Sequence, residues 1–447
     1  MVVLLGGENM KVSKYNHVYK FYDNVDQKVI YNARTGSLAL MNREYIDAYD
    51  SILKSQNIAN EKVAEQFLMG GFAVEDDIDE IDLIRMKTLT SRYSTNSLSL
   101  TIAPTMECNF DCVYCYEHIS EKAKRMSQET QDSIIKMIES KVGSIESLHI
   151  TWYGGEPTLA VDTVVQLSER MIKICDDNNI HYNAFIVSNG YALNESVAEQ
   201  LVDVRVGGVQ YSIDGPPETH DKRRPLKGGQ PTFEKIIENI RGTKNIFNGI
   251  SVRVNVDNEN QEQISSLLDI FKSNDIAVDD NVMIYVANVD SHNECYSRSL
   301  CSSGENFADF ELDFHKSKKD RGFKGTYRDK YPKIKANFCS ADSLNGLVID
   351  PEGYIYKCWS DIGIKERVTG NVNSSKANEK YNRTLLVDYM MYDSTTDSEC
   401  RDCSVLPLCV GGCPRKRMEN DSTKCTEYRY QLDEYVINTA KEIYDSK

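Results

Sequence analysis

The sequence predicts an α/β fold in which a partial (βα)6 barrel is preceded by a small N-terminal module and followed by a cysteine-rich domain. Three observations lead to this prediction. Six strand-like runs alternate with helical stretches between residues 97 and 289, a pattern typical of parallel sheets. Residues 1–92 have a different rhythm, and beyond residue 320 the alternation stops and cysteines cluster. A chain of 447 residues is also longer than one hydrophobic core usually organises.

The N-terminal module, residues 1–92, is expected to form a three-stranded meander, two helices and a short wing strand, a winged-helix-like arrangement. Short runs between turn signals predict strands at 17–22, 28–33 and 37–41. Asn42 is the expected N-cap of the first helix, and Gly70 and Gly71 end the second. An exposed strand edge in such a module suits capture of an extended peptide by strand addition. A purely structural N-terminal cap is the alternative interpretation.

Residues 93–320 are expected to form the barrel, with polar motifs at the C-terminal ends of its strands. The predicted strands are 97–104, 147–155, 183–190, 208–215, 250–257 and 282–289. Enzymes of this class build their active sites at that edge of the sheet. Polar signatures occur at or just after five of these strands, namely the loop from Cys108, Gly154-Gly155-Glu156, Ser188-Asn189, Ser212 with Asp214, and Asn255.

Charge and composition exclude several kinds of partner. The net charge of −16 comes from 68 acidic and 52 basic residues, which argues against nucleic-acid and membrane binding. After Met1, the opening residues contain only four consecutive apolar positions, too few for a signal peptide or a membrane span, so we expect a cytoplasmic protein. Thirteen cysteines in a reducing compartment favour metal ligation over a disulfide framework.

Cys108, Cys112 and Cys115 form a C-x3-C-x2-C loop after the first barrel strand. Thiolates select zinc or iron-sulfur clusters. Structural zinc normally takes four ligands, so three close cysteines leave one metal position vacant. A four-iron cluster held in this way has one open iron at which chemistry can occur. The zinc alternative would use His118 as the fourth ligand.

This motif, with Tyr114 directly before the third cysteine, resembles that of the radical S-adenosylmethionine (SAM) superfamily. The resemblance implies a 4Fe-4S cluster whose open iron chelates the amino and carboxylate groups of SAM. One electron from the cluster then cleaves the sulfonium and gives a 5′-deoxyadenosyl radical. The expected central domain is therefore a radical SAM barrel.

The resemblance also implies a SAM-binding edge, carried over position by position. Gly154, Gly155 and Glu156 match the family's Gly-Gly-Glu motif, which binds the SAM amino group through a backbone carbonyl and the carboxylate. The other matching positions lie at the ends of the third, fourth and fifth strands: Ser188 and Asn189 near the ribose or carboxylate, then Ser212 with Asp214, then Arg253 with Asn255.

The tail, residues 321–447, contains seven cysteines whose spacing resembles the SPASM extension of radical SAM enzymes. That resemblance implies two auxiliary 4Fe-4S clusters, and so three clusters in all. A double zinc ribbon is the alternative that the cysteines alone allow. By the family's interleaved ligation, Cys400, Cys403, Cys409 and Cys425 would hold the outer cluster, and Cys339, Cys358 and Cys413 the inner one.

Two positions depart from the pattern of anaerobic sulfatase-maturating enzymes. Lys333 stands where some relatives have a further inner-cluster cysteine. The inner cluster therefore either has an open iron, which could bind a substrate thiolate, or takes Cys295 or Cys301. Trp359 stands where those enzymes have an aspartate thought to act as a base, and Asp361 is in a different register. No catalytic base is assigned.

Two further features allow more than one interpretation. The basic stretch with Lys222, Arg223 and Arg224 could contact the SAM carboxylate or the substrate backbone, or form a solvated loop. Cys175 lies in a helical pattern and is expected to be a buried small hydrophobe.

Together these resemblances imply a ribosomal-peptide maturase of the thioether-forming, sactipeptide or ranthipeptide type. Its N-terminal module is similar to peptide-recognition elements and would bind the leader of a small cysteine-containing precursor peptide. A flavodoxin or ferredoxin would donate electrons. The alternatives are a carbon-carbon crosslinking cyclase, a formylglycine-forming sulfatase maturase and, outside enzymes, a zinc-stapled binding protein.

Overall fold

A computed structural model describes residues 10–22, 24–56, 60–115, 117, 125–276, 281–289, 301–323 and 330–444. Contacts group the chain into two compact units. The larger unit is Tyr93–Gly325 with Cys339–Met391, and the smaller unit is Met1–Arg92 with Thr326–Phe338 and Tyr392–Lys447. By this grouping the segment 321–447 is divided between the units, whereas the sequence led us to expect it as a domain of its own. The domain boundaries 1–92, 93–320 and 321–447 stay a prediction.

The larger unit is built on a parallel sheet with the strand order β11-β10-β9-β8-β7-β6. All six predicted strands are present, as β6 (Ser97–Ile102), β7 (Ser147–Trp152), β8 (His181–Ser188), β9 (Val206–Ile213), β10 (Gly249–Val256) and β11 (Val282–Asn288). No pairing joins β11 back to β6 in the described ranges, so the barrel is partial, as predicted.

Three strands from the tail extend this sheet beyond β6. β12 (Gly346–Ile349) pairs parallel with β6, and β13 (Tyr354–Tyr356) and β14 (Gly370–Asn371) continue antiparallel. The sequence did not predict these strands, because the regular alternation ends before them. Cys339 and Cys358 therefore flank a hairpin that belongs to the barrel sheet.

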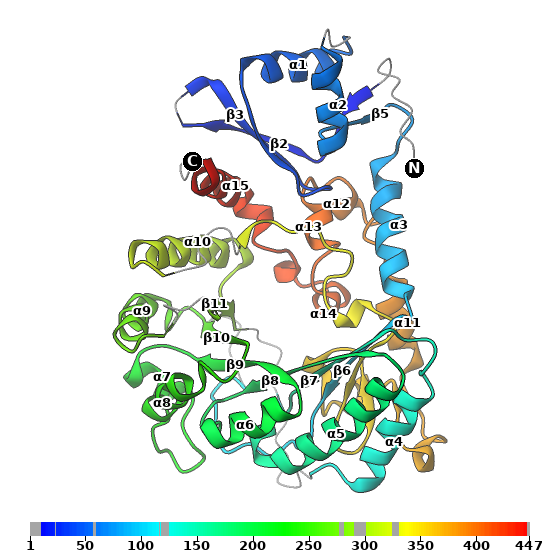
Figure 1. The fold of residues 1–447 in the computed structure, drawn as a ribbon, viewed down its shortest axis with the longest axis vertical. Coiled ribbons are helices and arrows are strands. Elements are labelled where there is room, and N and C mark those ends of the chain that lie inside the picture. The colour runs from blue at the N-terminus through cyan, green and yellow to red at the C-terminus, as the bar shows by residue number, and fades with distance from the viewer. Residues whose placement is uncertain are drawn as a thin grey trace. The chain divides into compact units, whose positions relative to one another are not determined.

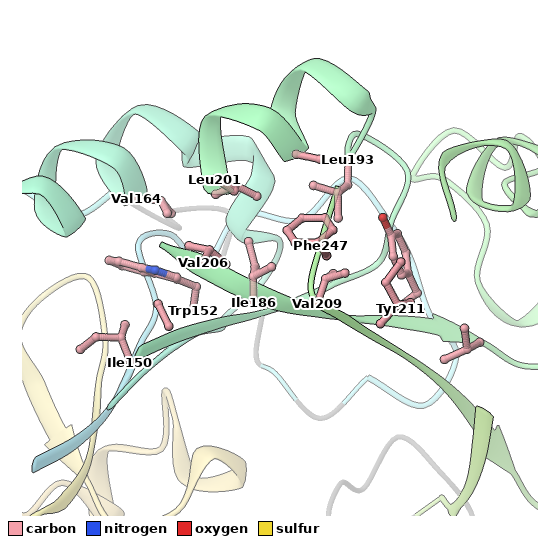
Figure 2. Packing of buried hydrophobic residues seen from close by; sticks show 14 of the residues in the cluster. Ile150, Trp152, Val164, Ile186, Leu193, Leu201, Val206, Val209, Tyr211 and Phe247 are labelled. Carbon is pink, nitrogen blue, oxygen red and sulfur yellow. The ribbon is translucent and has the colours of Figure 1, made fainter. Parts of the chain in front are cut away.

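Amphipathic helices cover one face of the sheet (Figure 1). In β7 the buried Leu148, Ile150 and Trp152 alternate with half-exposed residues, the period of a strand with one covered face. Figure 2 shows Trp152 and Ile186 of the sheet packed beneath Val164 and Leu201 of the helices. Each such fully buried side chain contributes about 2 kcal/mol. The helices of this unit are α4 (Gln128–Glu139), α5 (Val161–Asp177), α6 (Glu195–Asp203), α7 (Pro217–Arg223), α8 (Phe233–Thr243), α9 (Ile264–Ser273), α10 (Gly304–Asp320) and α11 (Arg383–Met391).

The smaller unit contains the predicted meander as β2 (Asn16–Phe21), β3 (Asn24–Asn32) and β4 (Leu38–Met41). Asn42 caps α1 (Arg43–Leu53) by accepting from the backbone N–H of Tyr45, and α2 (Glu61–Gly70) ends at the left-handed Gly71, both as predicted. The wing strand β5 (Ala73–Glu75) pairs with β1 (Met10–Val12). The other helices are α3 (Glu80–Tyr93), which starts in this unit, α12 (Ser398–Arg401), α13 (Leu406–Cys409), α14 (Pro414–Met418) and α15 (Tyr428–Tyr444).

Across the described residues, no helix combines the length and apolarity needed to cross a bilayer.

Candidate functional site

The loop with Cys108, Cys112 and Cys115 follows β6 and is held by the C-terminal end of α7 and the residues just after it. Asp111 and Val113 donate their backbone N–H groups to the carbonyls of Pro225 (2.9 Å) and Arg223 (3.1 Å). These bonds fix a loop that has no helix or strand of its own.

The three thiols of this loop are half-buried. Burial raises the pKa of Cys108 and of Cys115 to about 12. Burial also raises the pKa of Cys112, with the Arg224 guanidinium acting in the opposite direction. Cysteine must be deprotonated to bind a metal. Burial disfavours the thiolate form of these three cysteines, and the positive charge of bound iron would favour it.

Gly154 and Gly155 lie directly against the backbone of the cysteine loop. A Cβ on Gly155 would lie 2.4 Å from the carbonyl oxygen of Glu107 and 2.5 Å from that of Met106. Gly154 has φ +106°, and its Cβ would lie 2.6 Å from the carbonyl oxygen of Thr105. Only glycine fits both positions, because backbone atoms cannot move aside as a side chain can.

Glu156 connects the ends of β7 and β8. Its Oε1 accepts from the Thr158 N–H (3.0 Å) and from the hydroxyls of Thr158 (2.6 Å) and Ser188 (2.8 Å), and its Oε2 accepts from the Asn189 N–H (2.7 Å). Burial raises the pKa of Glu156, and these donors act in the opposite direction. The geometry thus gives this carboxylate a connecting role, and its direct contact with SAM stays a prediction.

Asn189 joins the end of β8 to the cysteine loop. Its Nδ2 donates to Asn109 Oδ1 (2.8 Å) and lies 3.9 Å from Cys108 Sγ. The predicted third-strand position is therefore beside the first cysteine.

The ends of β9 and β10 meet at Asp214 and Asn255. Asn255 Nδ2 donates to Asp214 Oδ1 (3.1 Å) and to the Tyr114 hydroxyl (3.0 Å). Arg253 Nε donates to Asn255 Oδ1 (2.8 Å). Ser212, on β9, is paired in register with Arg253. The structure therefore brings the predicted fourth- and fifth-strand residues and Tyr114 into one cluster.

Two of the three basic residues after β9 are buried in this cluster. Arg223 and Arg224 are 6% and 8% exposed, and Arg224 Nη1 donates to the Tyr114 hydroxyl (2.6 Å). Lys222 is exposed. The solvated-loop interpretation is therefore wrong: Lys222 is solvated but lies on α7, and the two arginines are buried.

The same cluster contains buried polar atoms that fit a polar ligand. Burial, with Arg224 nearby, lowers the pKa of His220 to about 4, so the ring is neutral, and its Nδ1 accepts from the Asp214 N–H (3.2 Å). His220 Nε2, Arg223 Nη1 and Arg224 Nε are buried and have no partner within the described parts of the chain. SAM carries carboxylate, hydroxyl and adenine groups that suit such atoms.

The four predicted outer-cluster cysteines line one pocket in the smaller unit. Cys400, Cys403, Cys409 and Cys425 share it with Gly411, Thr426 and Arg429, among others. A Cβ on Gly412 would lie 1.9 Å from the Lys424 carbonyl oxygen, and this close approach brings the Cys425 segment to the pocket. Four cysteines around one pocket are the number of ligands that a 4Fe-4S cluster takes.

We expect Gly412→Ala to lower the iron content by about four atoms per chain, because the new methyl group displaces the Cys425 segment. Gly322→Ala is the matched control: Gly322 has φ +77° against +76° for Gly412, and its Cβ would meet nothing within 4 Å. Iron and sulfide analysis of anaerobically reconstituted protein measures the effect. Full iron in Gly412→Ala, or equal loss in the control, would contradict this prediction.

The predicted inner-cluster cysteines belong to different units. Cys339 and Cys358 lie in the larger unit and Cys413 in the smaller one. Lys333 is exposed. The neighbour of Cys301, Ser302, accepts at its carbonyl from Asn288 at the end of β11 (2.9 Å), so Cys301 is at the edge that also carries the first cysteine loop. Cys295 and His118 lie outside the described residues.

The aromatic and acidic residues after Cys358 are also placed. Trp359 is 44% exposed and stacks on Tyr153, with ring centroids 5.4 Å apart. Asp361 is fully buried, accepts from the Tyr389 hydroxyl (3.0 Å) and lies 3.5 Å from Arg367 Nε. Asp361 therefore has structural partners and does not replace the missing base.

Other residues complete the account of the cysteines. Cys175 is fully buried in α5, as predicted. Across the described ranges, no three His, Cys, Asp or Glu side chains are grouped closely enough to hold a single metal ion.

The sequence analysis did not find two residues at the ends of the strands, Asp257 and Asn260. The Asp257 carboxylate accepts from Arg223, and the Asn260 side chain donates to the backbone carbonyl of Asp214. Isolated polar residues after a strand form no motif that could have indicated them.

Comparison with known proteins identifies the domain. Residues 102–271 match the model of the Radical SAM superfamily. The chain is 24% identical over 348 residues to a cysteine-type anaerobic sulfatase-maturating enzyme of Clostridium novyi, covering 72% of this chain and 90% of that one. It is 24% identical over 172 residues to the sporulation killing factor maturation protein SkfB of Bacillus subtilis, covering 38% and 39%.

Two solved structures share the fold. The sulfatase-maturating enzyme anSMEcpe with bound AdoMet has a TM-score of 0.59 at 21% identity, covering 77% of this chain and 96% of that one. SuiB of Streptococcus suis, bound to its precursor peptide SuiA, has a TM-score of 0.53 at 14% identity, covering 94% and 100%. The chain is therefore an enzyme that contains a Radical SAM domain at residues 102–271, and maturation enzymes are among the proteins that it resembles.

Proposed function

We propose that this enzyme is a peptide maturase that abstracts hydrogen from a ribosomally made precursor peptide and installs a cysteine thioether. One observation carries the proposal: the chain combines a three-cysteine loop at the active edge of the barrel with a separate pocket lined by four cysteines. A radical SAM enzyme that only cleaves SAM needs the first site alone. A second cluster supports a reaction that also removes an electron from the substrate.

The first site would hold a 4Fe-4S cluster on Cys108, Cys112 and Cys115. When bound, cluster and SAM supply the 5′-deoxyadenosyl radical. The backbone carbonyls of Gly154 and Gly155 are acceptors suited to the SAM ammonium, while Glu156 keeps this turn against β8. The residues suited to the ribose, adenine and carboxylate groups are Ser188, Asn189, Ser212, Asp214, Asn255 and Tyr114.

The auxiliary sites would take the electron that crosslinking releases. In thioether formation a C–H and an S–H bond break and a C–S bond forms. The balance would be one hydrogen atom, one proton and one electron: the hydrogen atom would leave to the radical that bound SAM supplies, the proton to solvent and the electron to the site that the auxiliary cysteines would hold. Cys400, Cys403, Cys409 and Cys425 would hold the outer cluster. Cys339, Cys358 and Cys413 would hold the inner one, which keeps an iron for the substrate thiolate.

The smaller unit would bind the leader of the precursor. In its described part, β2 and β4 are the edges of a three-stranded antiparallel sheet, and an extended peptide can add to such an edge. A flavodoxin or ferredoxin in the cytoplasm would supply the reducing electron. The acidic balance of the chain suits a basic peptide.

A second candidate is maturation of a sulfatase, favoured by the 24% identity to the Clostridium novyi enzyme over 72% of this chain. Trp359 argues against it, since an aspartate is expected there. Carbon-carbon crosslinking would release the same hydrogen atom, proton and electron, but it would join two carbon atoms and would need no thiol.

One experiment separates these functions. The reconstituted enzyme is incubated with SAM, a reductant and either a cysteine-bearing peptide from a short reading frame sought beside its gene or a sulfatase peptide. We expect the mass of the first peptide to fall by two hydrogens per crosslink. When its cysteine is replaced by alanine, we expect no reaction. Crosslinking that survives the replacement would indicate a carbon-carbon bond, and oxidation of the sulfatase peptide alone would indicate formylglycine formation. An unchanged peptide with intact SAM would overturn the proposal.

A further inference from the structure

Arg223, the last residue of α7, joins two buried carboxylates at neighbouring strand ends. Its Nε donates to Asp214 Oδ2 (3.3 Å), after β9, and its Nη2 donates to Asp257 Oδ2 (2.7 Å), after β10. Both carboxylates are fully buried. Two buried acids at adjacent positions need a shared cation, because an unpaired charge in such a setting is costly.

The same arginine reaches the cysteine loop in two ways. Its guanidinium carbon lies 5.2 Å from the centre of the Tyr114 ring, within the range of a cation-π contact. Its backbone carbonyl accepts from the Val113 N–H (3.1 Å). One residue therefore contacts three separate segments, namely the cysteine loop and the ends of two strands.

The orientation of Asp214 depends on this arginine. Asp214 Oδ1 accepts from Asn255 and Oδ2 from Arg223, while Asn255 also donates to the Tyr114 hydroxyl. Loss of Arg223 would free one oxygen of Asp214 and leave it beside the Asp257 carboxylate. The backbone N–H of Glu259 also donates to Asp257 (2.9 Å), but this donor lies on the same segment as Asp257 and does not bridge the two strand ends.

We propose that Arg223 is a positioning residue for SAM: by holding Asp214, Asp257 and Tyr114 in one arrangement, it sets the shape of the SAM-binding edge. The inference rests on the proposed function of that edge and deepens it. Arg223 contributes no ligand to the iron, and the cysteine loop keeps its backbone bond to Pro225 and the contact of Arg224 with Tyr114 when the Arg223 side chain is changed.

Lysine does not provide the same bridge. The planar guanidinium donates along two directions at once and packs flat on an aromatic ring, whereas an ammonium is a compact point charge. Arg223→Lys therefore keeps the charge and loses the geometry, and Arg223→Gln loses both. Lys222→Gln is the matched control, since Lys222 is the preceding residue, carries the same charge and is exposed.

The test uses full-length, anaerobically reconstituted enzyme and S-adenosylhomocysteine, which binds as SAM does but has no sulfonium to cleave. Iron per chain, the Kd by calorimetry, and the change that SAM causes in the EPR spectrum of the reduced cluster are measured for each variant. We expect Arg223→Gln to keep its iron and to bind S-adenosylhomocysteine about tenfold or more weakly than the unmodified enzyme. This is the effect expected when a charge-assisted hydrogen bond is lost. Arg223→Lys should also bind more weakly, and Lys222→Gln should match the unmodified enzyme.

Unchanged affinity and an unchanged EPR response in Arg223→Gln would overturn the inference while leaving the proposed function intact. If Arg223→Gln does not load with iron, Arg223→Lys decides the matter, because normal affinity in that variant would refute the need for a bridging guanidinium. An unmodified enzyme that carries its clusters and neither binds S-adenosylhomocysteine nor cleaves SAM would overturn the proposed function, and the inference with it.

Discussion

Replacing Cys108, Cys112 and Cys115 together with alanine is expected to abolish SAM cleavage and to remove about four of about twelve irons per chain. The outer pocket belongs to the other compact unit, so its cluster should remain. The iron that is left should therefore be redox-active and unable to react with SAM. Iron and sulfide analysis, together with detection of 5′-deoxyadenosine, measures both effects.

Cys175→Ala is the control for this experiment. Cys175 is also a cysteine of the larger unit, but it is fully buried near the C-terminal end of α5 among apolar side chains. We expect full iron and normal SAM cleavage in this variant, with only a small loss of stability. SAM cleavage in the triple variant, or zinc without sulfide in the unmodified protein, would refute the assignment of the cysteine loop to an iron-sulfur cluster.

The barrel could be predicted from the sequence because its signals are local. Each strand of the β6–β11 set is a run of apolar and β-branched residues next to an amphipathic helix, and parallel strands place their C-terminal ends at one edge. The positions of Ser188, Asn189, Asp214 and Asn255 follow from that rule alone. Two of them contact the cysteine loop in the structure, Asn189 through Asn109 and Asn255 through Tyr114.

The strands from the tail could not be predicted in this way. β12 has only four residues. It pairs with β6, where Leu347 lies opposite Leu100, a residue far away along the chain. No hydrophobic period marks such a short strand. The pairing uses the backbone edge of β6 that the other barrel strands leave unpaired. That edge exists only once the barrel has folded, so no single segment of the sequence indicates it.

The roles of Glu156 and Arg223 could not be predicted either, because they depend on the number of partners around each side chain. In the sequence, a glutamate after two glycines suggests a free carboxylate, and two adjacent arginines suggest either an anion site or a solvated loop. In the structure, Glu156 already has four donors, and Arg223 already has two carboxylates. Both side chains therefore hold the edge of the sheet together, a role that their positions in the sequence do not indicate.

Gly155→Ala is expected to prevent assembly of the SAM-binding cluster, because the added methyl group has no space. Its Cβ would lie within 2.5 Å of two successive carbonyl oxygens of the cysteine loop, and shifting that loop breaks the Glu156 N–H bond to Glu107 (2.8 Å). Overpacking against backbone costs about 1–3 kcal/mol or more, and here the strain falls on the segment that carries Cys108. We expect about four fewer irons per chain and no 5′-deoxyadenosine.

Gly249→Ala shows whether the Gly155→Ala effect is specific to close packing. Gly249 begins β10 in the same sheet, and a Cβ there would meet nothing within 4 Å, so this variant should load and react normally. If Gly155→Ala also retained full iron and SAM cleavage, the contact between the two-glycine turn and the cysteine loop would be unnecessary for the cluster. The steric reason for two glycines before Glu156 would then be refuted, and their role would have to lie in direct contact with SAM.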